Sequence, residues 1–260
     1  MTRASTRNPD SKIDKRGFRV LQQTAKVSRF KSSRQAKALI DAIKYGDSNL
    51  AIWLLKHRVD PTARDRKRRP ALWHAARWCR ANVIRELVKR GASLPDDVLM
   101  GPVHQKDEKT VRFLVERGAN VNCVARYTGG GGWFHPRQIL LTTAIGQPES
   151  IAIMLIRAGA RVNQLILAEP FAGTQNRSIL GLAAYLGLLK TVRAMIAAGA
   201  DVNMRDNSGG TALMDALAGG HLSVAMTLLN AGARADVRAN DGRTPASVAN
   251  ERALKVPGIA

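Results

Sequence analysis

Short apolar segments with helical spacing recur along the chain, and a glycine interrupts each of them. Between residues 179 and 203, Leu180 and Ala184 fall on one side of a first short helix, and Val192 and Met195 fall on one side of a second. Helices of roughly 8 to 10 residues are not stable alone in water. Each helix is therefore expected to bury its apolar side against a neighbour.

The neighbours are predicted to be copies of the same unit, because a Gly-Ala-x-Val-Asn motif repeats. It starts at Gly118, Gly159 and Gly199, with weaker copies at Gly91 and Gly232 and a degenerate copy at Arg58. The successive spacings are 33, 27, 41, 40 and 33 residues, and an apolar pair precedes every copy at the same offset. A period near 33 with helix–turn–helix content indicates a stacked repeat array.

The motif at residues 211–221, Thr-Ala-Leu-Met-Asp-Ala-Leu-Ala-Gly-Gly-His, resembles the Thr-Pro-Leu-His-x-Ala-Ala-x-x-Gly-His of ankyrin repeats. Residues 240–246 are similar to the start of another such repeat. The resemblance implies an all-α ankyrin-repeat solenoid of about six repeats with a partial C-terminal cap. The histidine of the family motif is replaced at Trp73, Met100, Leu141, Gly181 and Met214, which indicates a divergent array.

We expect a basic, disordered tail at residues 1–34 and a repeat domain at residues 35–256. The repeats are expected at 35–65, 66–95, 96–122, 123–163, 164–204 and 205–239, with a partial repeat at 240–256. Helices are predicted near 36–44, 48–56, 138–146 and 149–157.

Single residues add local expectations to this plan. Pro102 lies in the predicted first helix of the third repeat and should break it or make it irregular. Thr211 and Thr244 are expected to cap helix starts. Trp53 and Trp73 are predicted to lie in the core.

Positive charge is concentrated in the first third of the chain. The net charge is +21, and residues 1–90 hold 24 Lys and Arg against 7 Asp and Glu, whereas residues 91–260 hold 17 against 13. Such a block attracts acidic partners or polyanions.

The densest cluster lies in a predicted finger, the exposed hairpin between the first two repeats. It comprises Arg64, Arg66, Lys67, Arg68 and Arg69. One interpretation is a solvated loop, and the other is a contact for anions.

A second group of candidates follows from the resemblance to ankyrin repeats, in which the two residues after the Ala-Ala pair face the concave groove. Here the first two such pairs are Lys44 with Tyr45 and Arg77 with Trp78, so each joins a cation to an aromatic ring. Such pairs can hold phosphates and stack bases, or clamp an acidic peptide. The simpler interpretation is that Trp78 covers the edge of the apolar core.

A third candidate is the segment 125–137, which contains four successive glycines followed by Trp133 and Phe134. The glycines predict an enlarged mobile finger. The two aromatic residues are expected either to pack on the array or to form a contact with a partner.

No pattern indicates catalysis, a metal site or a cofactor. The five histidines fall in different repeats, and no His-Glu-x-x-His, Gly-x-Ser-x-Gly or Cys-x-x-Cys occurs. No apolar run reaches the roughly 18 residues of a transmembrane helix, and Met1–Arg7 is not a secretory signal. With only two cysteines, we expect a cytoplasmic protein, with a nuclear or organellar location as the alternative.

Two functions remain after these exclusions. The first is a non-catalytic scaffold that binds an acidic protein through the concave groove and the fingers. The alternative is binding of nucleic acid or a ribonucleoprotein through the basic N-terminal third, which predicts a steep salt dependence.

Overall fold

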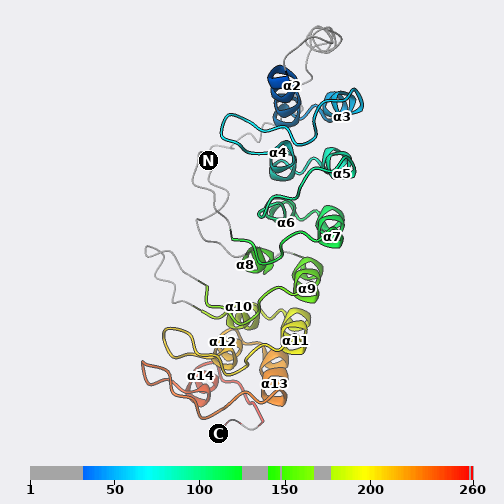
Figure 1. Cartoon of the computed structure of the whole chain (residues 1–260). Helices are drawn as coiled ribbons and strands as arrows, with labels where there is room; N and C mark the ends of the chain where they lie inside the picture. Colours follow the sequence, from blue (N-terminus) through cyan, green and yellow to red (C-terminus); the bar gives the residue numbers. More distant parts are fainter. Residues whose placement is uncertain (1–31, 125–139, 147, 167–176, 258, 260) are drawn as a thin grey trace, which may run out of the picture. The chain divides into compact units, whose positions relative to one another are not determined.

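The computed structural model describes residues 32–124, 140–146, 148–166, 177–257 and 259. They form two compact units that divide after Thr110, inside one helix; the first is called unit 1 and the second unit 2. Within these ranges there are thirteen helices and no strand, as the all-α prediction requires (Figure 1). No helix in the same ranges is both long enough and apolar enough to cross a membrane. Most of the predicted tail, residues 1–34, lies outside the described residues.

Unit 1 contains helix pairs in which the first helices stack on one another and the second helices form a second row (Figure 1). Its helices are α2 (Ser32–Tyr45), α3 (Ser48–Lys56), α4 (Ala71–Arg77), α5 (Ala81–Lys89), α6 (Met100–His104) and the start of α7 (Glu108–Glu116). Helix α4 packs between α2 and α6, and α3 packs on α5. The second predicted helix agrees with α3, whereas α2 begins earlier than predicted.

Unit 2 repeats the arrangement more regularly. Its helices are α8 (Leu140–Ala144), α9 (Glu149–Arg157), α10 (Ile179–Tyr185), α11 (Leu189–Ala197), α12 (Ala212–Ala218), α13 (Leu222–Asn230) and α14 (Pro245–Glu251). Helix α12 packs between α10 and α14, and α11 packs between α9 and α13. Helix α9 has the predicted bounds, and α8 ends earlier than predicted, while its predicted start at 138–139 lies outside the described residues.

The core of each unit is built from one apolar side of every helix. In unit 1, Leu50, Leu72 and Leu87 are fully buried. The prediction that Trp53 and Trp73 belong to this core was wrong, because both side chains are only half-buried. The indole Nε1 of Trp73 donates to Asp97 at 3.0 Å, so its polar group needs a position at the edge of the core.

Pro102 lies within a short helix and does not break it. Helix α6 has five residues, and Pro102 is the third of them. A backbone N–H in the first turn has no partner inside the helix, so a proline there removes no hydrogen bond. Of the two expected outcomes, the broken helix was wrong, whereas the helix is irregular in that it is short and follows a turn at residues 96–99.

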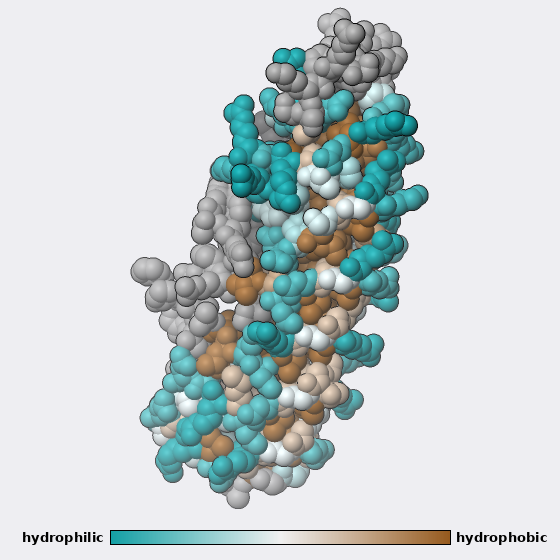
Figure 2. All heavy atoms as spheres, viewed as in Figure 1, coloured by the Kyte–Doolittle hydropathy of each residue, from teal (hydrophilic) through white to brown (hydrophobic). Residues whose placement is uncertain are grey.

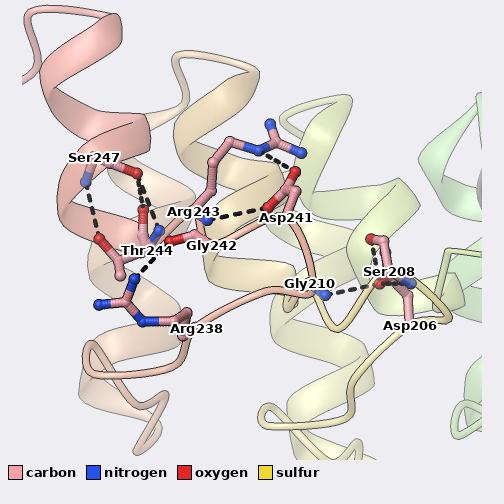
Figure 3. A network of polar contacts seen from close by, with 9 residues as sticks. All are labelled: Asp206, Ser208, Gly210, Arg238, Asp241, Gly242, Arg243, Thr244 and Ser247. Atoms are coloured by element: carbon pink, nitrogen blue, oxygen red, sulfur yellow. Dashed lines mark hydrogen bonds and ion pairs between the residues drawn. The ribbon is translucent and has the colours of Figure 1, made fainter.

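The two threonines at helix starts behave differently. Thr244 forms a reciprocal cap with Ser247: its Oγ1 accepts from the Ser247 N–H at 3.2 Å, and the Ser247 Oγ accepts from the Thr244 N–H at 3.0 Å (Figure 3). The Thr211 side chain makes no cap hydrogen bond and its Oγ1 has no partner among the described residues, so that prediction was wrong. Met214 stands at the position equivalent to Ser247, and its side chain has no hydroxyl to complete such a cap.

A candidate binding site on the basic finger and helix α4

The loop between α3 and α4 is a tight hairpin, and we call residues 64–69 the basic finger. The Asp65 N–H donates to the Arg69 carbonyl at 2.9 Å, and the Arg68 N–H donates back to the Asp65 carbonyl at 2.8 Å. The Arg64 Nη1 closes the loop by donating to the Arg68 carbonyl at 3.0 Å. The hairpin projects as a hydrophilic surface (Figure 2).

Asp65 organises the basic finger from inside. Its Oδ1 accepts from the backbone N–H groups of Lys67 and Arg69, both at 2.9 Å. Its Oδ2 accepts from the Arg69 Nε at 2.9 Å and lies 3.1 Å from the His74 Nε2. Burial alone would raise the pKa of the Asp65 carboxyl, but the hydrogen bonds and charge of Arg69, together with His74, lower that pKa to about 2. This carboxylate is therefore used in holding the loop and neutralises only Arg69.

His74 is buried beneath the basic finger. Burial lowers its pKa to about 4, the charge of Lys44 acts in the same direction, and the hydrogen bond with Asp65 opposes both. The imidazole is therefore neutral at pH 7, and it adds no charge to the site.

The remaining cations of the basic finger face solvent. The side chains of Arg66, Lys67 and Arg68 are exposed, and in the described part of the chain they form no ion pair. Three unpaired positive charges on consecutive residues give the finger tip a concentrated positive field.

Arg68 adopts a backbone conformation that favours glycine. The same turn occurs in unit 2 at residues 205–210 and 238–243, where Gly209 and Gly242 occupy the equivalent tip position (Figure 3). Their φ angles are 75° and 87°, and that of Arg68 is 61°. A residue with a Cβ costs roughly 1 to 2 kcal/mol in this region.

We expect Arg68→Gly to be more stable than Arg68→Ala by about 1 kcal/mol, because both variants lose the charge but only glycine removes the steric cost at positive φ. Urea unfolding followed by tryptophan fluorescence measures the difference, since three of the four tryptophans lie in unit 1. Equal stability of the two variants would show that the left-handed turn carries no strain.

A stripe of cations and rings runs along helix α4, and we call it the α4 stripe. It consists of Arg69, Trp73, Arg77 and Trp78, three of which are four residues apart. The Arg69 guanidinium lies 4.8 Å from the centre of the Trp73 ring. The Arg77 guanidinium lies 5.6 Å from the Trp73 ring and 6.0 Å from the Trp78 ring. These distances are those of cation–π contacts, so the stripe extends from the base of the basic finger to the end of α4.

The last two candidates in unit 1 lie at the end of α2, which packs on α4. Lys44 is exposed and close enough to influence His74. The Tyr45 side chain is 67% exposed and that of Trp78 is 45% exposed, so both rings present apolar surface to solvent. Part of the Trp78 ring is therefore accessible to a partner.

Two of the candidate residues predicted from the sequence are not described by the structure, and two residues of the site were not predicted. Trp133 and Phe134 lie outside the described residues. Asp65 and Trp73 were not predicted to organise the site. Trp73 could have been predicted, because it lies four residues after Arg69 and four residues before Arg77, on the same side of a helix. Asp65 could not be distinguished by pattern, because it lies within a run of cations.

The described residues contain no cluster of side chains suited to a metal ion. The Cys79 thiol donates to the Asp107 carboxylate at 3.3 Å, and burial together with that carboxylate raises the pKa of the thiol to about 12. Because the thiolate is the reactive form, Cys79 is unsuited to nucleophilic chemistry at neutral pH.

The comparison with protein families matches residues 39–125 and 141–241 to ankyrin repeats, in a family model of three copies. The matched segments cover most of the chain, and the chain belongs to the ankyrin-repeat family. Ankyrin repeats generally mediate protein–protein interaction and are typically non-catalytic. No curated protein gives a significant match to this sequence.

Proposed function

We propose that this protein is a non-catalytic scaffold that binds an acidic segment of another protein through the basic finger and the α4 stripe. The observation that carries the proposal is the inward position of Asp65. Its carboxylate is held by backbone N–H groups, Arg69 and His74, so Arg66 to Arg68 keep their charge at the surface. An acidic segment would gain charge-assisted hydrogen bonds from these side chains.

The backbone of unit 1 supports this proposal. Arg58, Arg68 and Lys106 have φ angles of 66°, 61° and 59°, in a region where glycine would remove a steric cost. At equivalent positions of unit 2, Gly199, Gly209 and Gly220 are glycines, although Ala253 also has a positive φ. Strain of this kind is often retained at functional sites. Three of the four described non-glycine residues with positive φ in unit 1 are exposed cations, the fourth being Cys79.

A second candidate function, binding of single-stranded nucleic acid, is favoured by one feature of the same site. Trp78 and Tyr45 are exposed, and the guanidinium of Arg77 lies over the Trp78 ring. Exposed rings beside cations can stack bases while the cations contact phosphates. The general role of ankyrin repeats in protein–protein interaction leads us to place the acidic protein segment first.

The test compares two fluorescent probes, a poly-glutamate peptide and a single-stranded RNA, by anisotropy at ionic strengths up to about 0.15 M. We expect the triple variant Arg66→Glu, Lys67→Glu and Arg68→Glu to weaken peptide binding by roughly 30- to 100-fold, because three ion pairs are replaced by repulsions. Trp78→Ala should weaken it less.

A matched control changes the net charge equally but away from the site. Arg157, Lys190 and Arg193 are exposed on α9 and α11, and their replacement by glutamate should leave peptide binding nearly unchanged. If both triple variants lose affinity equally, only the net charge matters and the proposed site is wrong. If RNA binds more tightly than the peptide and depends on Trp78, the nucleic-acid function replaces the first proposal.

A further inference from the structure

A second cation–aromatic pair lies in unit 2, at the same repeat positions as the α4 stripe. Counted from the residues that precede α4 and α10, Arg177 corresponds to Arg69, and Tyr185 corresponds to Arg77. The Arg177 guanidinium lies 4.3 Å from the centre of the Tyr185 ring. The two repeats therefore place a cation at the first of these positions, but the second position holds a cation in one repeat and an aromatic ring in the other.

Gly181 lies between Arg177 and Tyr185 in the sequence and lets an acidic side chain of the next repeat approach α10. Gly181 occupies the position of Trp73, and its lack of a side chain leaves space in the middle of the α10 surface. The Asp215 carboxylate of α12 fills part of this space, because a Cβ on Gly181 would overlap the Asp215 Oδ2. The Asp215 Oδ1 lies 3.5 Å from the Arg177 Nε.

Arg177 is held between two neighbours and still reaches solvent. Its backbone is fixed because the Arg177 carbonyl accepts from the Ile166 N–H at 2.8 Å. Its side chain is 35% exposed, whereas that of Asp215 is 14% exposed. Within the described ranges, the long contact of its Nε with Asp215 is the ion pair that Arg177 makes. Its two terminal nitrogens are the atoms that a bidentate carboxylate would use.

Exposed apolar side chains lie at the end of α10, whose Tyr185 ring contacts Arg177. The side chains of Tyr185 and Leu186 are 37% and 44% exposed at the end of α10. His221 lies against the turn at Gly187, where a Cβ would be 2.6 Å from its ring. Leu222, the next residue, is 41% exposed. A cation bordered by exposed apolar side chains fits a segment that carries a carboxylate next to an apolar residue.

We infer that Arg177, Tyr185 and Leu186 form a second binding site, in unit 2, for a peptide segment that combines a carboxylate with an apolar side chain, and that Asp215 competes with this carboxylate for Arg177. The inference does not depend on the proposed function of the basic finger, because its residues lie in the other unit.

The ionisation of Asp215 supports the competition. Burial raises the pKa of its carboxyl to about 6, and the nearby Asp206 acts in the same direction. Arg177 and Arg243, which precede α10 and α14, oppose the shift. Above this pKa the Asp215 carboxylate attracts Arg177, and below it the neutral acid releases the guanidinium. A glutamate in a peptide stays ionised down to its ordinary pKa of about 4.3, so peptide binding should strengthen between about pH 7 and pH 5.

The experiment uses the full chain with Arg66→Gln, Lys67→Gln and Arg68→Gly, which weakens binding at unit 1, so that any dependence of the remaining binding on Arg177 or Leu186 reports unit 2. The probe is a fluorescent peptide of alternating glutamate and leucine. We expect its affinity to rise roughly fivefold from about pH 7 to about pH 5, as for one exposed ion pair. Asp215→Asn should reach the higher affinity already at pH 7 and lose the pH dependence. Arg177→Gln should abolish the gain.

Leu186→Ser is a further variant at an exposed position, and it keeps the test valid if changes at Arg177 or Asp215 disturb folding. It should weaken the glutamate–leucine peptide and leave a poly-glutamate peptide unaffected. Failure of the glutamate–leucine peptide to bind, or binding that ignores both Arg177→Gln and Leu186→Ser, would overturn the inference. Neither result bears on the basic finger, whose three tip cations are removed in this background and are tested separately with the poly-glutamate peptide.

Discussion

Gly101→Ala is expected to destabilise unit 1 by about 2 to 3 kcal/mol, although alanine is intrinsically the better helix former by roughly 1 kcal/mol. The added Cβ would overlap the Ala76 carbonyl and lie 3.0 Å from the Arg77 Cα. These are backbone atoms of α4, so no side-chain rotation can relieve the contact. Helices α4 and α6 would have to separate, and the core between them would lose its packing.

Urea unfolding monitored by tryptophan fluorescence measures this effect, and Gly91→Ala is its control. Gly91 has a φ angle of 87° and open space where its Cβ would be, so alanine there should cost only about 1 kcal/mol from the backbone conformation. If Gly101→Ala unfolds at the same urea concentration as the unchanged chain, the close approach of α4 and α6 is wrong.

Acidification is expected to destabilise unit 1 by about 2 kcal/mol between about pH 7 and pH 5, because of His74. The pKa of His74 is about 4 in the folded state and 6.5 in the unfolded chain. Between these values the unfolded state binds a proton that the folded state cannot accept, so the free energy of unfolding falls as the pH decreases. The pKa of Asp65, about 2, keeps that group ionised throughout this range.

His74→Gln removes the titrating group and should flatten the pH dependence of unit 1, even if its stability at pH 7 is lower. Unit 2 provides an internal comparison with the opposite sign. The folded pKa of Asp215, about 6, exceeds its ordinary value of 3.8, so protonation favours the folded state as the pH falls through this range. The prediction fails if the urea midpoints of the unchanged protein and of His74→Gln, followed by tryptophan fluorescence, shift equally with pH.

The repeat architecture was predictable from sequence because its determinants are local and periodic. The glycine at each turn, the apolar pair before each Gly-Ala-x-Val-Asn motif and the short amphipathic helices are all visible in the sequence, and they led to the all-α fold and to the bounds of α3 and α9. Pro102 misled the prediction because its effect depends on its position within a helix turn, which periodicity does not resolve.

The site was harder to predict because its geometry depends on contacts between residues that a pattern does not connect. The basic finger was recognisable as a cluster of charge, but the inward turn of Asp65 depends on the folded hairpin and on His74 beneath it. Trp73 looked apolar in sequence, whereas its Nε1 bonds to Asp97 in a later loop. In unit 2, the contact between Asp215 and the empty position at Gly181 joins two helices from different repeats.

In unit 2, asparagine side chains form hydrogen bonds between adjacent repeats. The side chains of Asn122, Asn163 and Asn203 each accept a hydrogen bond from a backbone N–H of the next repeat and donate to a carbonyl there. In unit 1 the corresponding residues are Thr62 and Pro95, neither of which has a side-chain amide.

In a repeat protein, cooperativity arises from the coupling between adjacent repeats. The asparagine bonds strengthen that coupling at three successive junctions of unit 2, so these repeats should exchange their amide hydrogens as one block. The repeats that carry the basic finger lack these bonds and should open in smaller steps, at a lower free-energy cost. Local opening would therefore begin beside the binding surface, while unit 2 remains folded.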